Sequence, residues 1–157
     1  PITFDNLCTG WQDAVKFGPF EQGDLLDRGR LDEVFAKYKL IAVMHFAALS
    51  QVGESMDVPG KYWRNNVLGS LCLIEAAVAA NCKKFVFSST CATYGEQDNV
   101  LLDENTPQAP INAYGASKQS IEEMLEHFGA SNGLSHVIFR YFNVAGADPD
   151  GEVGEFH

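Results

Sequence analysis

Three strongly apolar, β-rich runs constrain the fold of this chain more than any other feature of its sequence. The runs are LIAVMHFAA at 40–48, KFVFSST at 84–90 and HVIFRYFN at 136–143. Each run is nearly continuous rather than alternating, which is typical of parallel strands covered on both faces. The sequence therefore predicts three buried strands of a parallel sheet.

Helical patterns separate these runs. They cover 65–80 and 113–129, with a shorter one near 30–38, and short segments at 1–6 and 20–24 are predicted as strands or strand ends. Strands that alternate with helices build βαβ units with right-handed crossovers. We therefore expect one α/β domain with a doubly wound, Rossmann-like parallel sheet.

The charge of the chain bears on its partners. At 157 residues and a formal net charge of −10, the chain is long enough for one packed domain and lacks the basic surface that nucleic acids or anionic membranes require. No apolar run reaches the length of a membrane span. We expect neither a nucleic-acid partner nor a membrane partner.

The cysteines and histidines show no metal-ligand spacing. Cys8, Cys72, Cys82 and Cys91 form no CxxC pair, and the four histidines are scattered. His45 stands among apolar neighbours, where packing is the simplest role. We predict no catalytic metal and a reducing, cytoplasmic location.

Polar and small residues follow the predicted strands. In open parallel sheets, ligands bind outside the carboxyl ends of the strands. The residues at these ends are Asp5, Asn6, Gly23, Asp24, His45 to Ala48, Ser88 to Thr90, and Tyr141 to Asn143. Any one of them is explained equally well by the ordinary polarity of loops, but together they predict a ligand site at this edge.

Tyr114 and Lys118 are spaced to act together. In the stretch NAYGASKQS at 112–120, they stand four residues apart on a predicted helix, so their Cβ atoms should be about 5–6 Å apart. An ammonium group at that distance would favour the ionised phenol and lower its pKa. The pair predicts a tyrosine that acts as a base, although the spacing alone is weak support.

Seven further segments share one order and spacing with a known family. They are DNLCTG (5–10), GDLLD (23–27), HFAALSQVGES (45–55), NNVLGS (65–70), FVFSSTCATYG (85–95), YGASK (114–118) and RYFNVAGADPDG (140–151). Across essentially its whole length, the chain resembles the extended short-chain dehydrogenase/reductases, and among them the UDP-glucose 4-epimerases.

The resemblance also indicates what the sequence lacks. A member of this family would begin with a strand and a GxxGxxG turn that holds the cofactor pyrophosphate, and this chain has no such fingerprint. We therefore expect residues 1–157 to be a partial NAD-binding Rossmann domain, truncated at both ends and without the C-terminal substrate lobe. As an internal fragment, it should be inactive by itself.

The resemblance implies a reaction and its catalytic residues. In the family, NAD takes a hydride from C4 of a UDP-sugar, the 4-keto intermediate turns over, and the hydride returns to the opposite face. Tyr114 would be the base, and Lys118 would lower its pKa and bind the cofactor ribose. Thr90 stands where many relatives carry a serine, and its hydroxyl would contact the sugar oxygen, although β propensity alone would also explain it.

The resemblance further implies the binding residues. Asp5 would accept hydrogen bonds from the adenosine ribose, with Asn6 alongside it and Asp24 and Leu25 flanking the adenine. The remaining cofactor residues would be Phe46, Ala47, Ser50, Asn65, Ser88 and Tyr141, together with Tyr114 and Lys118. Asn65 could instead cap a helix. Thr90, Tyr114 and Asn143 would contact the nucleotide-sugar.

Other functions stay open at this point. A 4,6-dehydratase is disfavoured because Thr90 is followed by Cys91 and Ala92 rather than by an acid pair. A UDP-pentose 4-epimerase cannot be separated from a UDP-glucose 4-epimerase. A non-catalytic nucleotide-binding or oligomerising fragment is the alternative of another class. Relatives pair through helices equivalent to 65–80 and 113–129, so we expect a homodimer, although these helices could also pack within one chain.

Overall fold

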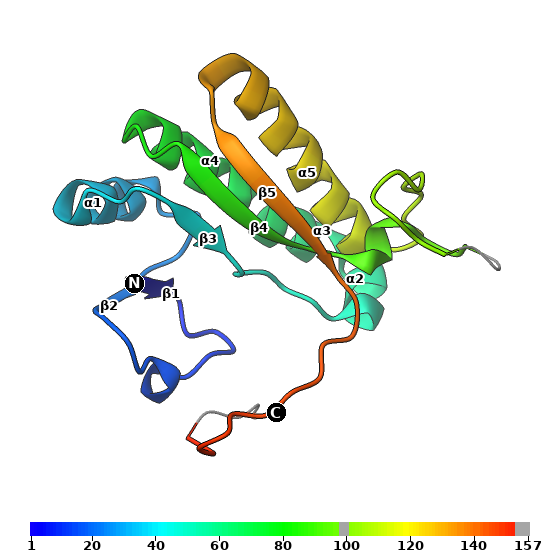
Figure 1. The fold of residues 1–157 in the computed structure, drawn as a ribbon, viewed down its shortest axis with the longest axis horizontal. Coiled ribbons are helices and arrows are strands. Elements are labelled where there is room, and N and C mark those ends of the chain that lie inside the picture. The colour runs from blue at the N-terminus through cyan, green and yellow to red at the C-terminus, as the bar shows by residue number, and fades with distance from the viewer. Residues whose placement is uncertain (98–100, 153–157) are drawn as a thin grey trace.

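The computed structural model of the chain describes residues 1–97 and 101–152. Strands and helices alternate along the chain (Figure 1). The strands are β1 (Thr3–Asp5), β2 (Phe20–Gln22), β3 (Val43–His45), β4 (Lys84–Thr90) and β5 (Ser135–Tyr141). The α-helices are α1 (Arg28–Tyr38), α2 (Val52–Asp57), α3 (Pro59–Tyr62), α4 (Gly69–Ala79) and α5 (Ala113–Asn132), with short helical turns η1 (Gln12–Ala14), η2 (Trp63–Leu68) and η3 (Cys91–Thr93).

The strands form two parallel sheets rather than one. β1 pairs with β2, and β4 lies between β3 and β5. The register places His45 beside Phe87 and Thr90 beside Tyr141, so all carboxyl ends of the larger sheet lie at one edge. The parallel α/β prediction is confirmed, and the division into two sheets is a feature that the sequence did not indicate.

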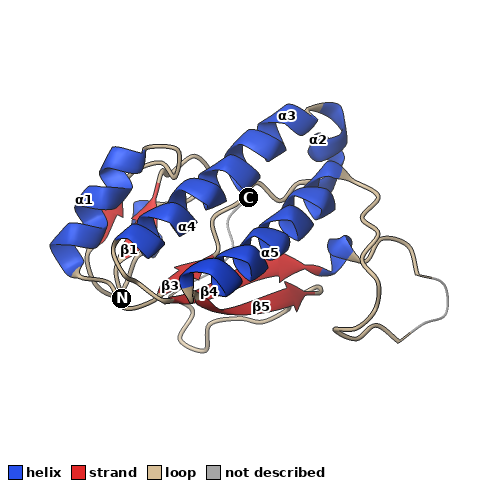
Figure 2. Cartoon of the chain, turned by 90° about the horizontal axis from the view of Figure 1, so that it is seen from above, coloured by secondary structure: helices blue, strands red, loops and turns tan. Residues whose placement is uncertain are grey.

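Helices cover one face of the larger sheet. α4 and α5 run side by side over β4 and β5 (Figure 2), and α1 joins the same core through Leu31 and Phe35. Phe85, Phe87 and Leu125 are buried at its centre. Burying such large apolar side chains contributes about 1.5–3 kcal/mol each.

The opposite face of the larger sheet is open among the described residues. Met44, Val137 and Phe139 are 67%, 50% and 47% exposed. The expectation that these strands are covered on both faces is therefore wrong for residues 1–97 and 101–152. The runs are continuous because both faces are apolar, but a sequence pattern cannot report which apolar face is covered.

The helix that contains Asn65 begins earlier than expected. α3, η2 and α4 follow one another without a break from residue 59 to 79, and η2 is a π-helical segment. Pro59 stands in the first turn, where a missing N–H costs no hydrogen bond. Asn65 therefore lies inside a helix, and the predicted helix start at 65 is wrong. π-helical turns often occur at functional sites.

Polar and flexible residues mark the ends of α5. The Asn112 side chain accepts a 2.7 Å hydrogen bond from the Gly115 N–H at the start of the helix. Gly133 ends the helix in a left-handed conformation with φ of 66°. α5 therefore starts at the predicted residue and runs three residues past the predicted end at 129.

His45 is part of the hydrophobic core. Its Nε2 lies 2.7 Å from the Ser70 Oγ, and its ring contacts those of Phe85 and Phe87. Burial, together with the positive charge of Lys118, lowers the pKa of His45 to about 3. The structure confirms the expected packing role.

The low pKa of His45 predicts a loss of stability in acid. The folded protein holds His45 neutral down to about pH 3, whereas histidine in the unfolded chain gains a proton near its ordinary pKa of 6.5. As pH falls between these values, the free energy of unfolding should drop by about 1.4 kcal/mol per pH unit from this group. Urea unfolding at several pH values in this range should show that the free energy of unfolding of His45→Gln falls less steeply with falling pH than that of the unaltered protein. An equally steep fall would contradict the low pKa of His45.

Candidate active site

The first turn of α5 packs directly against the end of β4. A Cβ added to Gly115 would lie 2.5 Å from the Ala92 carbonyl oxygen, a distance that no side chain tolerates. Thr90 stands at the junction, where its Oγ1 accepts the Ala92 N–H at 3.2 Å. This close approach brings Tyr114 within interaction range of the Thr90 side chain.

Lys118 is buried below this junction. The residue is only 2% exposed, its Nζ donates to the Ser88 carbonyl oxygen at 2.7 Å, and it lies 4.8 Å from the centre of the Phe87 ring. Burial lowers the pKa of Lys118 to about 8, and the nearby Glu122 carboxylate opposes this shift. The amine therefore titrates much closer to neutral pH than a surface lysine.

The pKa of Tyr114 moves in the opposite direction from the one expected. The pKa of Tyr114 is raised above its ordinary value, mainly by burial and also by the neighbouring Cys91. The hydrogen bond with Thr90 acts in the opposite direction. The expectation that Lys118 lowers the phenol pKa is not met in this structure. The Lys118 Nζ is turned to the Ser88 carbonyl, an orientation that i, i+4 spacing does not specify.

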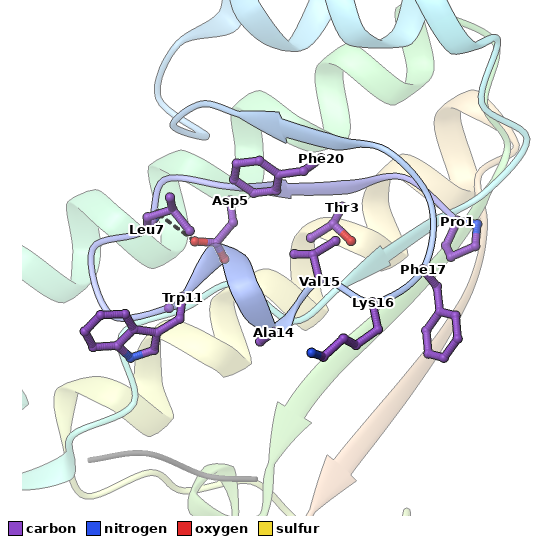
Figure 3. A pocket seen from close by; sticks show the side chains of 11 residues that line it. Pro1, Thr3, Asp5, Leu7, Trp11, Ala14, Val15, Lys16, Phe17 and Phe20 are labelled. Atoms are coloured by element: carbon purple, nitrogen blue, oxygen red, sulfur yellow. Dashed lines mark hydrogen bonds between the residues drawn. The ribbon is translucent and has the colours of Figure 1, made fainter. Parts of the chain in front are cut away.

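Asp5 points into a pocket beside β1. The pocket has a volume of about 360 Å³, and its lining includes Thr3, Leu7, Trp11 and Ala14 (Figure 3). The Asp5 Oδ1 accepts a 2.6 Å hydrogen bond from the Leu7 N–H, and no hydrogen bond to Oδ2 is recorded among the described residues. One carboxylate oxygen therefore orients the loop while the other can accept a ligand hydroxyl.

Several predicted cofactor residues meet in one cavity between the two sheets. The cavity has a volume of about 740 Å³ and lies between β1 and β3. Its lining includes Asp5, Leu25, Phe46 and Ala47. These residues are far apart in the sequence and come together because they follow or flank parallel strands.

Other predicted residues are committed to local contacts. The Asn6 Nδ2 donates to Asp24 Oδ2 at 2.8 Å, and the Leu26 N–H donates to Asp24 Oδ1 at 2.9 Å. The Asn65 Nδ2 donates to Asn66 Oδ1 at 2.9 Å. Asn6 and Asp24 therefore join the loops that follow β1 and β2, and Asn65 bonds to its neighbour on the helix.

The remaining predicted residues are spread along the strand ends. Ser88 offers its carbonyl to Lys118, and Tyr141 stacks against Phe139 with ring centroids 5.8 Å apart. Ser50 is exposed in the loop between β3 and α2, and Asn143 is exposed after β5. Their roles in binding stay predictions.

Sequence reasoning missed two buried polar residues near Tyr114. Asn66 bonds both the N–H and the carbonyl of Leu49, and its Nδ2 donates to Ser117 Oγ at 3.2 Å. Ser117 in turn donates to the Tyr114 carbonyl at 2.7 Å. In the sequence, the adjacent asparagines at 65–66 are the feature that could have indicated a buried polar residue here.

The described residues offer neither a metal cluster nor a membrane span. Within residues 1–97 and 101–152, no group of three or more His, Cys, Asp or Glu side chains could hold a metal ion. No helix among these residues is long and apolar enough to cross a bilayer. All four cysteines are free thiols, and the reducing compartment stays a prediction.

Comparisons with known proteins place the chain in a family. The sequence pattern of the NAD dependent epimerase/dehydratase family matches residues 2–156. The chain belongs to this family. It is 52% identical to a UDP-glucose 4-epimerase of Rhizobium meliloti (strain 1021) over 157 residues, which cover 100% of the chain and 48% of that relative.

Two other comparisons bear on fold and substrate. A crystal structure of UDP-glucose 4-epimerase from Brucella ovis in complex with NAD matches with a TM-score of 0.97 and 48% identity, covering 100% of the chain and 48% of that protein. A probable UDP-arabinose 4-epimerase of Arabidopsis thaliana is 43% identical, covering 96% of the chain and 39% of that relative. The chain spans about half the length of the relatives it matches.

The contact between Gly115 and Ala92 predicts a sensitive position. Gly115→Ala should push α5 away from η3 and lower the free energy of unfolding by about 1–3 kcal/mol. Gly60→Ala is the matched control, because a Cβ on Gly60 meets nothing within 4 Å. That helical substitution should stabilise the protein by about 0.5–1 kcal/mol. Equal effects of both variants in urea unfolding would contradict the close approach.

Proposed function

We propose that the full-length protein containing this chain is an NAD-dependent 4-epimerase of UDP-sugars, with UDP-glucose and UDP-galactose as its substrate pair. The observation that carries this proposal is the junction of Thr90, Tyr114 and Lys118 at the carboxyl edge of β4. Membership of the epimerase/dehydratase family supports the reaction class.

The chain's residues fit a dinucleotide. The Asp5 carboxylate at the end of β1 suits ribose hydroxyls, and its cavity continues past Leu25 to Phe46 and Ala47. Further along the same edge, Ser88 lies next to the Lys118 ammonium, which can donate to a second ribose. Asn6, Asp24, Ser50, Asn65 and Tyr141 are proposed to line the same path.

Side chains of this chain would carry out the proton transfer. When bound, NAD supplies the hydride acceptor for C4 of the sugar. Tyr114 would take the proton from the C4 hydroxyl, and Thr90 would hold that oxygen by a hydrogen bond. Lys118, charged below about pH 8 and held by the Ser88 carbonyl, would donate to the cofactor ribose. Asn143 is proposed to face the nucleotide-sugar.

Replacing Tyr114 tests the proposal directly. Tyr114→Phe in the NAD-loaded full-length protein should lower kcat for UDP-galactose conversion by about 10²–10⁴-fold, because the general base is lost. A coupled assay of UDP-glucose formation measures the rate. Unchanged turnover would remove Tyr114 from the mechanism.

Two controls accompany this experiment. Thr90→Ser keeps the hydroxyl and should retain most of the activity, whereas Thr90→Val should not. The 157-residue chain with added NAD is expected to be inactive and provides the blank. Turnover by that chain would contradict the expectation that further residues are needed.

A pentose substrate is the second candidate. The 43% identical relative named as a probable UDP-arabinose 4-epimerase favours it. Comparing kcat/KM for UDP-galactose and UDP-arabinose in the full-length protein decides between them. A higher value for UDP-arabinose would replace the hexose assignment.

We also propose a homodimer formed through the helices at 65–80 and 113–129. Trp63 and Leu68, on the helix that contains η2 and α4, are 42% and 43% exposed and offer apolar surface for such a contact. Leu68→Glu should convert the full-length protein from dimer to monomer in sedimentation analysis. The control Leu101→Glu, at a side chain that is 97% exposed, should leave the sedimentation mass at that of the dimer. A monomeric parent protein would contradict the proposal.

A further inference from the structure

A buried carboxylate lies directly behind the Thr90, Tyr114 and Lys118 junction. Glu122 is 4% exposed and stands one helical turn after Lys118 on α5. Arg140 on β5 donates to its Oε2 from Nη2 at 2.8 Å and from Nε at 3.0 Å. Ser89 on β4 donates to Oε1, and Gln108 donates to Oε2 at 3.0 Å.

The partners of Glu122 are sequence neighbours of the candidate catalytic groups. Ser89 stands between Ser88, whose carbonyl accepts the Lys118 ammonium, and Thr90. Ser89 and Arg140 are direct partners in the register of β4 and β5. The carboxylate thus ties α5 to both strands beside the Ser88 carbonyl that accepts Lys118.

Arg140 extends this connection to the loop before α5. Its Nη1 donates to the Tyr94 hydroxyl at 3.1 Å, and its guanidinium lies 5.1 Å from the centre of the Tyr94 ring. Tyr94 donates to the Asp103 carbonyl at 2.9 Å. The loop that leads to Asn112 and Tyr114 is therefore anchored on the same ion pair.

We propose that Glu122, paired with Arg140, is a positioning residue for epimerisation. The functional sequence motif on α5 then extends from Tyr114 and Lys118 to Glu122, as Tyr114-x3-Lys118-x3-Glu122. The carboxylate orients β4, so that Thr90 and the Ser88 carbonyl meet Tyr114 and Lys118. Its charge also helps to keep the Lys118 amine protonated. This inference rests on the proposed function for its kinetic part only.

The charge effect follows from the groups around Lys118. Tyr114 and Glu122 flank it on α5, His45 lies on β3, and the Ser88 carbonyl and Phe87 ring come from β4. Arg140 faces Glu122 from β5. Removing the Glu122 charge leaves the burial of the amine unopposed, and burial favours the neutral form.

The test compares two buried carboxylates in the full-length protein. In Glu122→Gln, the titration midpoint of Lys118, followed by NMR of ¹³C-labelled lysines and assigned with Lys118→Arg, should fall by about one pH unit or more. The kcat should fall about tenfold, with KM changed by less than about threefold. The control is Glu21→Gln, because Glu21 is 7% exposed and binds Arg30, Lys37 and Tyr38 far from the junction.

The outcomes separate a positioning role from a structural one. If Glu122→Gln only lowers the melting temperature, as Glu21→Gln should, and leaves the Lys118 midpoint and kcat unchanged, the proposal is wrong. If Glu122→Gln does not fold, Glu122→Asp keeps the charge and shortens the reach. Glu122→Asp should lower kcat while the titration midpoint of Lys118 stays constant, and an unchanged kcat overturns the proposal.

The NMR titration needs no turnover. If the unaltered protein epimerises no UDP-sugar, the proposed function fails by itself. The shift of the Lys118 midpoint in Glu122→Gln still decides whether the carboxylate controls the amine.

Discussion

Backbone pairing of β4 with β3 on one side and β5 on the other determines where every candidate active-site group lies. Parallel strands cannot be joined by a tight turn, so each needs a crossover that returns the chain to the same edge. The helix from 59 to 79 and α5 serve as these crossovers. As a result, the loop after β3, the Ser88 to Thr90 segment and the start of α5 all come together at one end of the sheet.

The two ionisable side chains behind this edge show how burial shapes the chemistry. Lys118 is buried and has no direct ion pair within residues 1–97 and 101–152, so its charge depends on a carbonyl oxygen, an aromatic ring and a carboxylate one turn away. Glu122 is buried with an arginine that donates to it from two nitrogens, an arrangement that is costly to break from either side. The amine can titrate while the carboxylate remains paired.

Local patterns predicted the elements that carry the site. The bounds of β4 and the start of α5 follow from an apolar run and from Asn112 as a helix cap, and both were predicted at the correct residues. The motif that contains Tyr114 and Lys118 was likewise visible in the sequence. These features depend on residues within about one helical turn or one strand, which is the range over which sequence patterns report structure.

Contacts between distant segments could not be predicted. The close approach of Gly115 to Ala92, the orientation of Lys118 toward Ser88 and the π-helical segment around Asn65 all depend on how α5 packs against β4 and the 59–79 helix. The same limit explains the wrong expectation about the second face of the sheet and about the Tyr114 pKa. Glu122 was missed because its partners come from three other segments of the chain.

The open face of the larger sheet has a thermodynamic consequence. A compact chain of this mass should expose roughly 7,800 Å², whereas this chain of 17.2 kDa exposes 9923 Å². Unfolding therefore uncovers less new surface than is usual for the length, and the side chains of Met44, Val137 and Phe139 are part of the surface already in contact with water. Heat-capacity changes and denaturant m-values scale with newly exposed surface, so the chain should unfold with smaller values of both than its size suggests.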